Sequence, residues 1–335
     1  MNELIHGYRM LTDFTTSNAG MCQWGFAEKG GHEFFIKQLL SPKYPLDESV
    51  LDRSIIQAMR SEADSFFEKR KRYYEVLATC RTGNLITVHD FFRDGSFYYV
   101  VTDRVHNKNI SLREMSSLPE DQKRLLIKVL LHAVSNVHEK HIVHSDLKLD
   151  NVLFKVTEMG YLTTKLIDFD AGFFEDDVPD EVQGDQVYFS PEAILKNNEE
   201  DVEITTKSDI FSLGLLLHQF WCGHLPSYDV EEYQYASVAL LEDQPLGIDP
   251  SIPWDIAAMI KQMLSFNPED RPSARQVLIT ALRDGLFIST MRPREEEWEQ
   301  IIGGPAAETV ETPVVHVEEK PARTGFSRPS DDDLL

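Results

Sequence analysis

The stretch that decides the fold is His144-Ser145-Asp146-Leu147-Lys148-Leu149-Asp150-Asn151-Val152-Leu153-Phe154. It places an acid, Asp146, an amine, Lys148, and an amide, Asn151, on a short segment that leads into an apolar run. Seventeen residues after Asn151, a second apolar run ends in another acid, Asp168. Short apolar runs bounded by polar residues are typical of buried strands, so the sequence predicts both polar groups on loops beside short strands.

Two carboxylates and an amide in this arrangement suit phosphoryl transfer. One carboxylate can accept the proton of an attacking hydroxyl group, while the other carboxylate and the amide can hold the magnesium ions that neutralise a triphosphate. Taken alone, Asp146 could equally be an acid that caps a turn or a helix. Lys148, two residues later, and Asn151, five residues later, favour the catalytic interpretation.

These segments resemble the catalytic loop, H-R-D-x-K-x-x-N, and the metal-binding motif, D-F-G, of the eukaryotic-like (bacterial-type) serine/threonine protein kinases. The resemblance implies that Asp146 is the catalytic base and that Lys148 stabilises the transferred phosphoryl group. It also implies that Asn151 and Asp168 bind Mg²⁺ and, through it, the phosphates of ATP.

Apolar alternation in the N-terminal part of the chain predicts five strands and one helix. The strands span about residues 8–14, 21–28, 33–39, 85–92 and 97–101, and the helix spans about residues 51–80. From about residue 110 to 285 the chain is mainly helical. The resemblance therefore implies an α+β, bilobal protein-kinase fold over residues 8–285, with an antiparallel-sheet lobe at about 8–105 and a helical lobe at about 106–285.

Part of the predicted sheet lobe resembles the family's phosphate-binding region. Lys37 ends a strand-like run seventeen residues after Gly20, which matches the spacing between the family's phosphate loop and its phosphate-contacting lysine. Family members carry G-x-G-x-x-G in that loop. Here Thr15 and Ser17 replace the first two glycines and Gly20 keeps the third, and we expect Ser17 and Gly20 to bind nucleotide.

The last predicted strand of this lobe leads into the expected adenine pocket. The resemblance places Thr102 at the back of that pocket and the segment from Asp103 to Val105 where its backbone would bond adenine. ATP and Mg²⁺ are therefore the expected cofactors.

One part of the resemblance stays open. Protein kinases of this family pair the strand lysine with a helix glutamate, but Tyr73 stands at the corresponding position here. The acids that lie nearby in the sequence are Glu62, Glu68 and Glu75. The sequence does not decide which of them, if any, pairs with Lys37. Asp170 replaces the glycine of D-F-G, which removes backbone freedom from that loop.

Three residues farther along the chain resemble scaffold elements of the protein-kinase family. The resemblance implies that Glu192 pairs with Arg271 in the core, a charge-assisted contact that orders the substrate platform. It also implies that Asp209 holds the backbone of the catalytic loop. These elements favour a protein substrate over a small molecule.

The segment that follows Asp168 gives a prediction about regulation. Residues 169–186 contain no serine, threonine or tyrosine. Ser145 also replaces the arginine that normally pairs with a phosphorylated activation loop. Both features predict activity without activation-loop phosphorylation. Asp185 stands where the family usually has a threonine, and we expect it to pair with Lys148.

Composition limits the classes of partner. The chain has 335 residues and a formal charge of -23, a field that repels nucleic acid and anionic lipid. No apolar run is long enough to span a bilayer, and the three cysteines lack metal-ligand spacing. A cytoplasmic protein is expected. The acidity either maintains solubility or attracts basic protein substrates.

Residues 292–335 change character and predict an acidic, disordered tail. Thr309 and Thr312 lie in this tail, where a phosphorylated threonine could recruit a phosphothreonine-binding partner. The alternative is an inert tail.

The combined prediction is a serine/threonine protein kinase that uses Mg-ATP. Two alternatives stay open. The reduced glycine loop and the absent helix glutamate would also suit a pseudokinase that acts as a nucleotide-binding scaffold. A kinase that acts on a small molecule is the other alternative.

Overall fold

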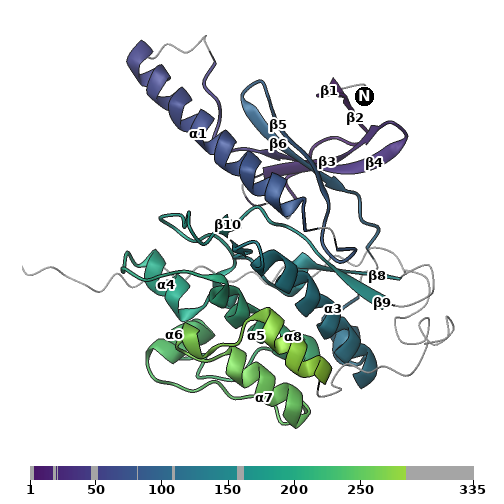
Figure 1. Cartoon of the computed structure of the whole chain (residues 1–335), viewed down its shortest axis with the longest axis vertical. Helices are drawn as coiled ribbons and strands as arrows, with labels where there is room; N and C mark the ends of the chain where they lie inside the picture. The colour runs from purple at the N-terminus through teal and green to yellow at the C-terminus, as the bar shows by residue number, and fades with distance from the viewer. Residues whose placement is uncertain are drawn as a thin grey trace, which may run out of the picture. The chain divides into compact units, whose positions relative to one another are not determined.

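The computed structural model describes residues 4–17, 20, 22–46, 52–80, 82–107, 110–156 and 162–283. The described residues belong to one compact unit of the chain. Its N-terminal part is a twisted sheet with one long helix, and its C-terminal part is mainly helical (Figure 1).

The N-terminal part contains a six-stranded antiparallel sheet of order β1-β2-β3-β4-β6-β5. Its strands are β1 (Leu4–Ile5), β2 (Tyr8–Met10), β3 (Cys22–Lys29), β4 (His32–Leu39), β5 (Val88–Asp94) and β6 (Phe97–Asp103). All five predicted strands are present. Strand β1 was not predicted, because its two residues are too few to show an alternation of apolar and polar side chains. Strand β2 is shorter than predicted because Leu11 and Thr12 both donate to the Phe26 carbonyl, a bulge that ends the ladder.

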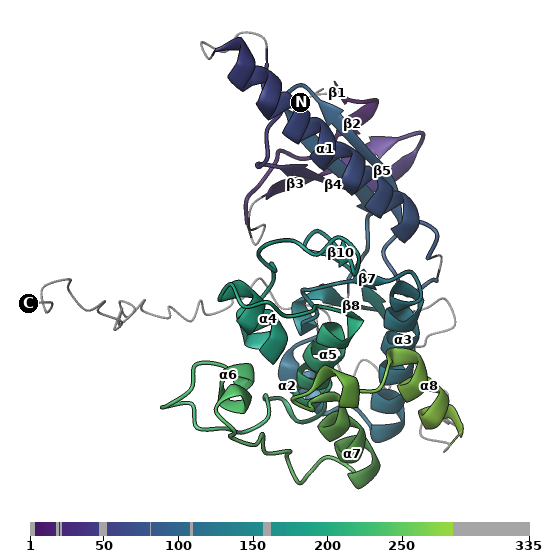
Figure 2. The same cartoon turned by 60° about the vertical axis from the view of Figure 1, so that its left-hand side comes forward.

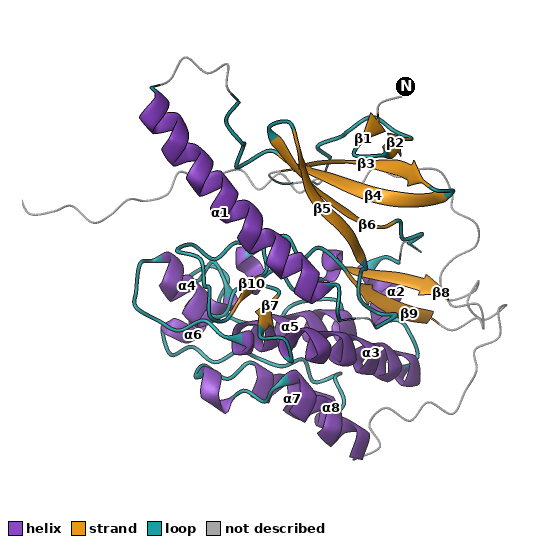
Figure 3. Cartoon of the chain, turned by 45° about the horizontal axis from the view of Figure 1, so that its top comes forward, coloured by secondary structure: helices purple, strands orange, loops and turns teal. Residues whose placement is uncertain are grey.

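The helix of the N-terminal part, α1 (Arg53–Leu77), begins at Asp52, whose side chain accepts a hydrogen bond from the Ser54 amide. It ends three residues before the predicted boundary at residue 80. Its first turns extend beyond the sheet and are mostly exposed (Figure 3). Its last turns bury Tyr73, Tyr74 and Leu77. The helix is therefore anchored by its C-terminal end, next to the loops of the candidate site.

The C-terminal part is built around one helix, α5 (Thr206–Cys222), which lies among the other helices (Figure 2) and is buried on all sides over most of its length. The other helices are α2 (Leu112–Ser116), α3 (Glu120–His138), α4 (Pro191–Asn197), α6 (Ala236–Leu241), α7 (Trp254–Met263) and α8 (Ala274–Arg283). Two short ladders, β8 (Val152–Val156) with β9 (Leu162–Leu166) and β7 (Ile142–Val143) with β10 (Phe173–Phe174), carry the polar loops. The predicted α+β fold is confirmed.

Both predicted scaffold contacts are present. The Arg271 guanidinium donates to both carboxylate oxygens of Glu192, at 2.6 and 2.9 Å, and its side chain is fully buried. Asp209, in the first turn of α5, accepts the backbone N–H groups of His144 at 2.7 Å and Ser145 at 2.9 Å. Asp209 thus fixes the start of the catalytic loop.

Some predictions concern residues outside the described ranges. The acidic tail at 292–335, with Thr309 and Thr312, lies entirely there. The domain boundaries at residues 8 and 285 stay predictions. Within the described ranges, no helix combines the length and apolar character that crossing a bilayer requires.

Candidate active site

Two adjoining cavities, of about 1010 and 910 Å³, meet at a common wall formed by Lys37, Lys148, Asp168 and Asp170. The larger cavity is also lined by the predicted site residues Ser17, Thr102, Asp103, Val105 and Asn151. The smaller cavity adds the last two predicted site residues, Gly20 and Asp146. The structure therefore brings all ten together around one site, although they come from both parts of the fold.

Asp146 lies at the centre of a hydrogen-bond network. Its Oδ2 accepts a hydrogen bond from Asn151 Nδ2 at 2.8 Å and lies 3.1 Å from Lys148 Nζ. Its Oδ1 accepts the backbone N–H of Asp185 at 2.9 Å. The expected contact between Lys148 and Asp185 is present but longer, at 3.8 Å. This network holds the Asp146 carboxylate in a fixed orientation at the edge of the smaller cavity.

Lys37 contacts two carboxylates of the metal-motif loop. Its Nζ lies 2.7 Å from Asp168 Oδ1 and 2.8 Å from Asp170 Oδ2. Burial would lower the pKa of Lys37, but the two acids outweigh burial and raise it. Burial, followed by the nearby Asp170 charge, raises the pKa of Asp168. A cation at Asp168 would offset the effects of burial and of the Asp170 charge on this pKa. The Asp168 carboxylate with the Asn151 amide oxygen is a suitable ligand set for Mg²⁺.

Comparisons with known proteins show the family of this chain. The model of the protein kinase domain matches residues 55–281, more than half of the chain. The chain belongs to the protein kinase domain family. The matched region includes Asp146, Lys148, Asn151 and Asp168, whereas Lys37 lies before it. The place of Lys37 in the kinase site therefore rests on its contacts with Asp168 and Asp170.

Individual relatives are also serine/threonine kinases by name. The chain is similar to the probable serine/threonine-protein kinase fhkA of Dictyostelium discoideum, at 24% identity over 83% of this chain and 50% of the relative. It is 31% identical to the serine/threonine-protein kinase pim-2 of Danio rerio over 58% of this chain and 59% of that protein. It is 26% identical to the serine/threonine-protein kinase PksC of Streptomyces coelicolor over 70% of this chain and 45% of that protein. The chain thus spans about half the length of the curated relatives it matches.

The helix acids considered from sequence do not reach Lys37. Glu62, Glu68 and Glu75 are all exposed on α1. Among the described residues, the ion pairs of Lys37 are those with Asp168 and Asp170. Asp170 was read from sequence only as a lost glycine. In this kinase domain it is a direct partner of the lysine.

The larger cavity has an aromatic wall that the sequence analysis missed. Trp24, Phe26 and Phe35 line it. Trp24 pairs in register with Lys37, and Phe26 pairs with Phe35, so side-chain alternation places all four on the same face of the sheet. Trp24 and Phe35 stack with ring centroids 5.3 Å apart. Alternation in the sequence puts Phe35 on the face of Lys37, but the position of Trp24 opposite Lys37 depends on the register of β3 with β4.

The segment predicted to bond adenine begins at Asp103, whose carboxylate and backbone N–H already make hydrogen bonds within the protein. Its carboxylate accepts from His89 at 2.6 Å and from Lys165 at 3.0 Å. Burial would raise the pKa of Asp103, but these hydrogen bonds and one from Thr87 lower it. Its backbone N–H donates to the Thr87 carbonyl at 3.2 Å. The Asp103 side chain therefore fastens the end of β6 beside the cavity.

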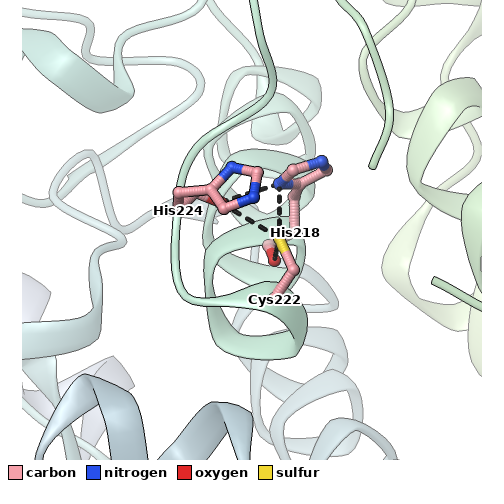
Figure 4. Close-up of side chains that lie close together, drawn as sticks. All are labelled: His218, Cys222 and His224. Carbon is pink, nitrogen blue, oxygen red and sulfur yellow. Dashed lines mark hydrogen bonds between the residues drawn. The ribbon is translucent and has the colours of Figure 1, made fainter. Parts of the chain in front are cut away.

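A cluster of metal-ligand residue types lies elsewhere, at the C-terminal end of α5 (Figure 4). The ligand atoms of His218, Cys222 and His224 all lie within 4.8 Å of one another. However, His218 Nε2 accepts the Asp249 N–H at 3.0 Å, so its Nδ1 carries the proton and donates to the His224 carbonyl at 2.8 Å. Burial lowers the pKa of His218 and keeps this neutral form. A metal at Nδ1 would break both hydrogen bonds, and we interpret the cluster as a helix cap.

Proposed function

We propose that this kinase domain transfers the γ-phosphate of Mg-ATP to serine or threonine hydroxyl groups of proteins. The observation that carries the proposal is the convergence of five predicted residues around the wall that the two cavities share. Lys37, Lys148 and Asp168 lie in that wall, Asn151 lines the larger cavity and Asp146 lines the smaller one. A nucleotide in the larger cavity would thus present its terminal phosphate toward the cavity that contains Asp146.

Each residue has a separate task in this proposal. Asp146 orients the substrate hydroxyl and accepts its proton, while Lys148 stabilises charge on the phosphoryl group in flight. Asn151 donates its amide N–H groups to Asp146, which leaves its amide oxygen for a cation. Asp168 and Asn151 would hold Mg²⁺, which neutralises phosphate charge. Lys37 would bind the α- and β-phosphates.

The backbone groups of Ser17 and Gly20 are the proposed contacts above the phosphates. Thr102 and the segment from Asp103 to Val105 bound the end of the cavity that would receive the adenine. Trp24 and Phe35 offer it an aromatic surface, since a nucleobase stacks on aromatic side chains whatever its identity.

Basic protein substrates suit the smaller cavity. Beyond Asp146 and Asp168, its wall includes Asp177, Asp180 and Glu181. Acidic side chains outnumber basic ones in this wall, and such a wall attracts a cationic peptide and raises its local concentration. This proposal assigns the acidity of Asp177, Asp180 and Glu181 to substrate binding.

Activity independent of activation-loop phosphorylation is also part of the proposal. Ser145 Oγ donates to the Gln183 carbonyl at 2.5 Å and so ties the catalytic loop to the segment. Asn197 exchanges two hydrogen bonds with the Val182 backbone, at 2.8 and 2.9 Å. A Cβ at Gly184 would lie 2.5 Å from the Ser145 carbonyl oxygen, so only glycine permits this approach. These contacts support the proposal that the segment is ordered without a phosphate.

Treatment of the purified kinase with a phosphatase should leave its initial rate of phosphoryl transfer unchanged within about twofold, because the segment is held by contacts between protein groups that need no phosphate. Ser145→Ala should slow transfer by a few-fold, since one such bond contributes about 1 kcal/mol. Initial rates before and after phosphatase treatment test this. A large loss on dephosphorylation would contradict the proposal.

A non-catalytic scaffold is the second candidate. The replacement of two loop glycines and the exposure of every candidate helix glutamate favour it. The intact set of Lys37, Asp146, Asn151 and Asp168 in one site opposes it. A small-molecule kinase has no need of a platform ordered by Glu192 and Arg271.

Incubation of the pure protein with γ-labelled Mg-ATP, with and without a general basic protein substrate, separates these candidates. We expect label on the protein substrate and a much weaker signal from Asp168→Asn, which keeps the side-chain shape but loses a metal-ligand charge. Nucleotide binding without transfer would support the scaffold. Equal transfer by wild type and Asp168→Asn would contradict the assigned site.

A further inference from the structure

Lys37 needs a partner other than Asp168 when the site is in use. In the proposed function Asp168 holds Mg²⁺, and a carboxylate oxygen bound to the metal is no longer fully available to the lysine. The Asp168 oxygen that contacts Lys37 lies 2.7 Å from it, and Asp170 Oδ2 lies 2.8 Å from it. Of these two acids, only Asp170 has no other task in the proposed mechanism.

Asp170 is oriented by helix α1. Its second carboxylate oxygen, Oδ1, accepts a hydrogen bond from the Tyr74 hydroxyl at 3.0 Å. The two oxygens of one carboxylate thus connect Lys37 of β4 with Tyr74 of α1. Tyr74 is buried, so bulk water does not compete with its hydroxyl for the Asp170 carboxylate.

The loop that carries Asp170 is also fastened to α1. The Arg70 guanidinium donates to the Gly172 carbonyl at 2.7 Å and to the Asp170 carbonyl. The Tyr73 hydroxyl donates to the Phe169 carbonyl at 3.0 Å. The helix therefore supplies hydrogen-bond donors to the loop, where an acid directed at the lysine was expected from the family pattern.

We propose that Asp170 is the acid that positions Lys37 for nucleotide binding, and that α1 acts on Lys37 through Asp170. This rests on the proposed function, because Lys37 is taken as the phosphate-binding lysine. Asp170 and Tyr74 are positioning residues: they contact Lys37 or each other and not the reacting atoms. The aspartate that replaces the D-F-G glycine then makes the contact with the lysine that the family's helix glutamate would make.

Binding of Mg-ADP to the full chain tests the proposal through a double-mutant cycle of Asp170→Asn and Lys37→Met. Asp170→Asn should weaken binding about tenfold, the effect of losing one hydrogen bond to a charged group. In the Lys37→Met background, Asp170→Asn should have no further effect. Asp176→Asn is the matched control, since Asp176 is an exposed acid of the same segment and outside both cavity walls.

Kinetics separate positioning from general damage. Asp170→Asn should raise the KM for ATP more than it lowers kcat, and Asp170→Glu, which keeps the charge, should restore part of the loss. Tyr74→Phe should give a smaller change in the same direction that disappears in the Asp170→Asn background. Equal Mg-ADP binding by wild type and Asp170→Asn would overturn the proposal, as would equal weakening with and without Lys37.

Failure of the proposed function gives a different result. If the wild type binds no Mg-ADP, the nucleotide assignment is wrong. The four proteins of the cycle, namely the wild type, the two single variants and the double variant, are then compared by urea unfolding. Coupled losses of stability for Lys37→Met and Asp170→Asn would still support the link between these residues. Additive losses would overturn it.

Discussion

Glu192→Ala should lower the free energy of unfolding by about 3–5 kcal/mol, because it leaves a buried guanidinium without its counter-ion. The Arg271 side chain has no exposed surface. Besides the two oxygens of Glu192, it donates to the carbonyls of Ser265, Lys207 and Phe266 at 2.7, 3.0 and 2.8 Å. Those carbonyls carry no net charge, so they cannot replace the carboxylate.

Urea unfolding measures this loss, and a second ion pair of the same length provides the control. Arg275 and Glu139 also lie 2.6 Å apart, but their side chains are 65% and 48% exposed. Glu139→Ala should therefore cost less than about 1 kcal/mol. Similar losses for the two variants would show that burial does not decide the contribution of Glu192.

The contacts that sequence predicted correctly share one property: both partners belong to motifs with fixed spacing. Asp209 and the loop that begins at His144 lie in two such motifs, and Glu192 and Arg271 each lie in a recognisable segment. Such motifs fix local geometry, and the family resemblance supplies the partner. For that reason the fold and ten of the residues around the two cavities could be predicted without coordinates.

The contacts of Asp170 could not be predicted in this way. Its partners, Lys37 and Tyr74, are 133 and 96 residues away in the chain. The family pattern puts glycine at position 170, and so supplied no partner for an acid there. The sequence showed one missing glutamate and one unexpected aspartate, and only their placement in space connected the two observations.

The aromatic wall was missed for a different reason. Strand alternation places Phe35 and Lys37 on one face, but it does not say which face meets a cavity. The pairing of β3 with β4 sets Trp24 opposite Lys37, so Trp24 lies on the same face of the sheet as the lysine that lines the cavity. Register between strands depends on the turn at Gly30 and Gly31, which both adopt positive φ.

Asp146→Asn should lower kcat for phosphoryl transfer by about 10²–10⁴-fold, the usual contribution of a positioned general base. The KM for ATP should change little, because Asp146 is assigned to the substrate hydroxyl and not to the nucleotide. An asparagine has nearly the same shape and keeps one acceptor oxygen. It can still accept the Asp185 N–H, so the fold should survive. Steady-state kinetics with a saturating protein substrate measure the change.

The same substitution at an exposed acid separates charge from position. Asp176→Asn removes an equal charge from the segment that faces the site, so it should leave kcat unchanged if overall acidity is not the cause.

Asn151 Nδ2 and Lys148 both face Asp146 Oδ2, and an amide nitrogen there would meet two donors. The variant's amide oxygen must then face one side of the network only, which predicts some loss of stability in addition to the loss of kcat. A normal kcat in Asp146→Asn with its fold intact would mean that another group accepts the proton.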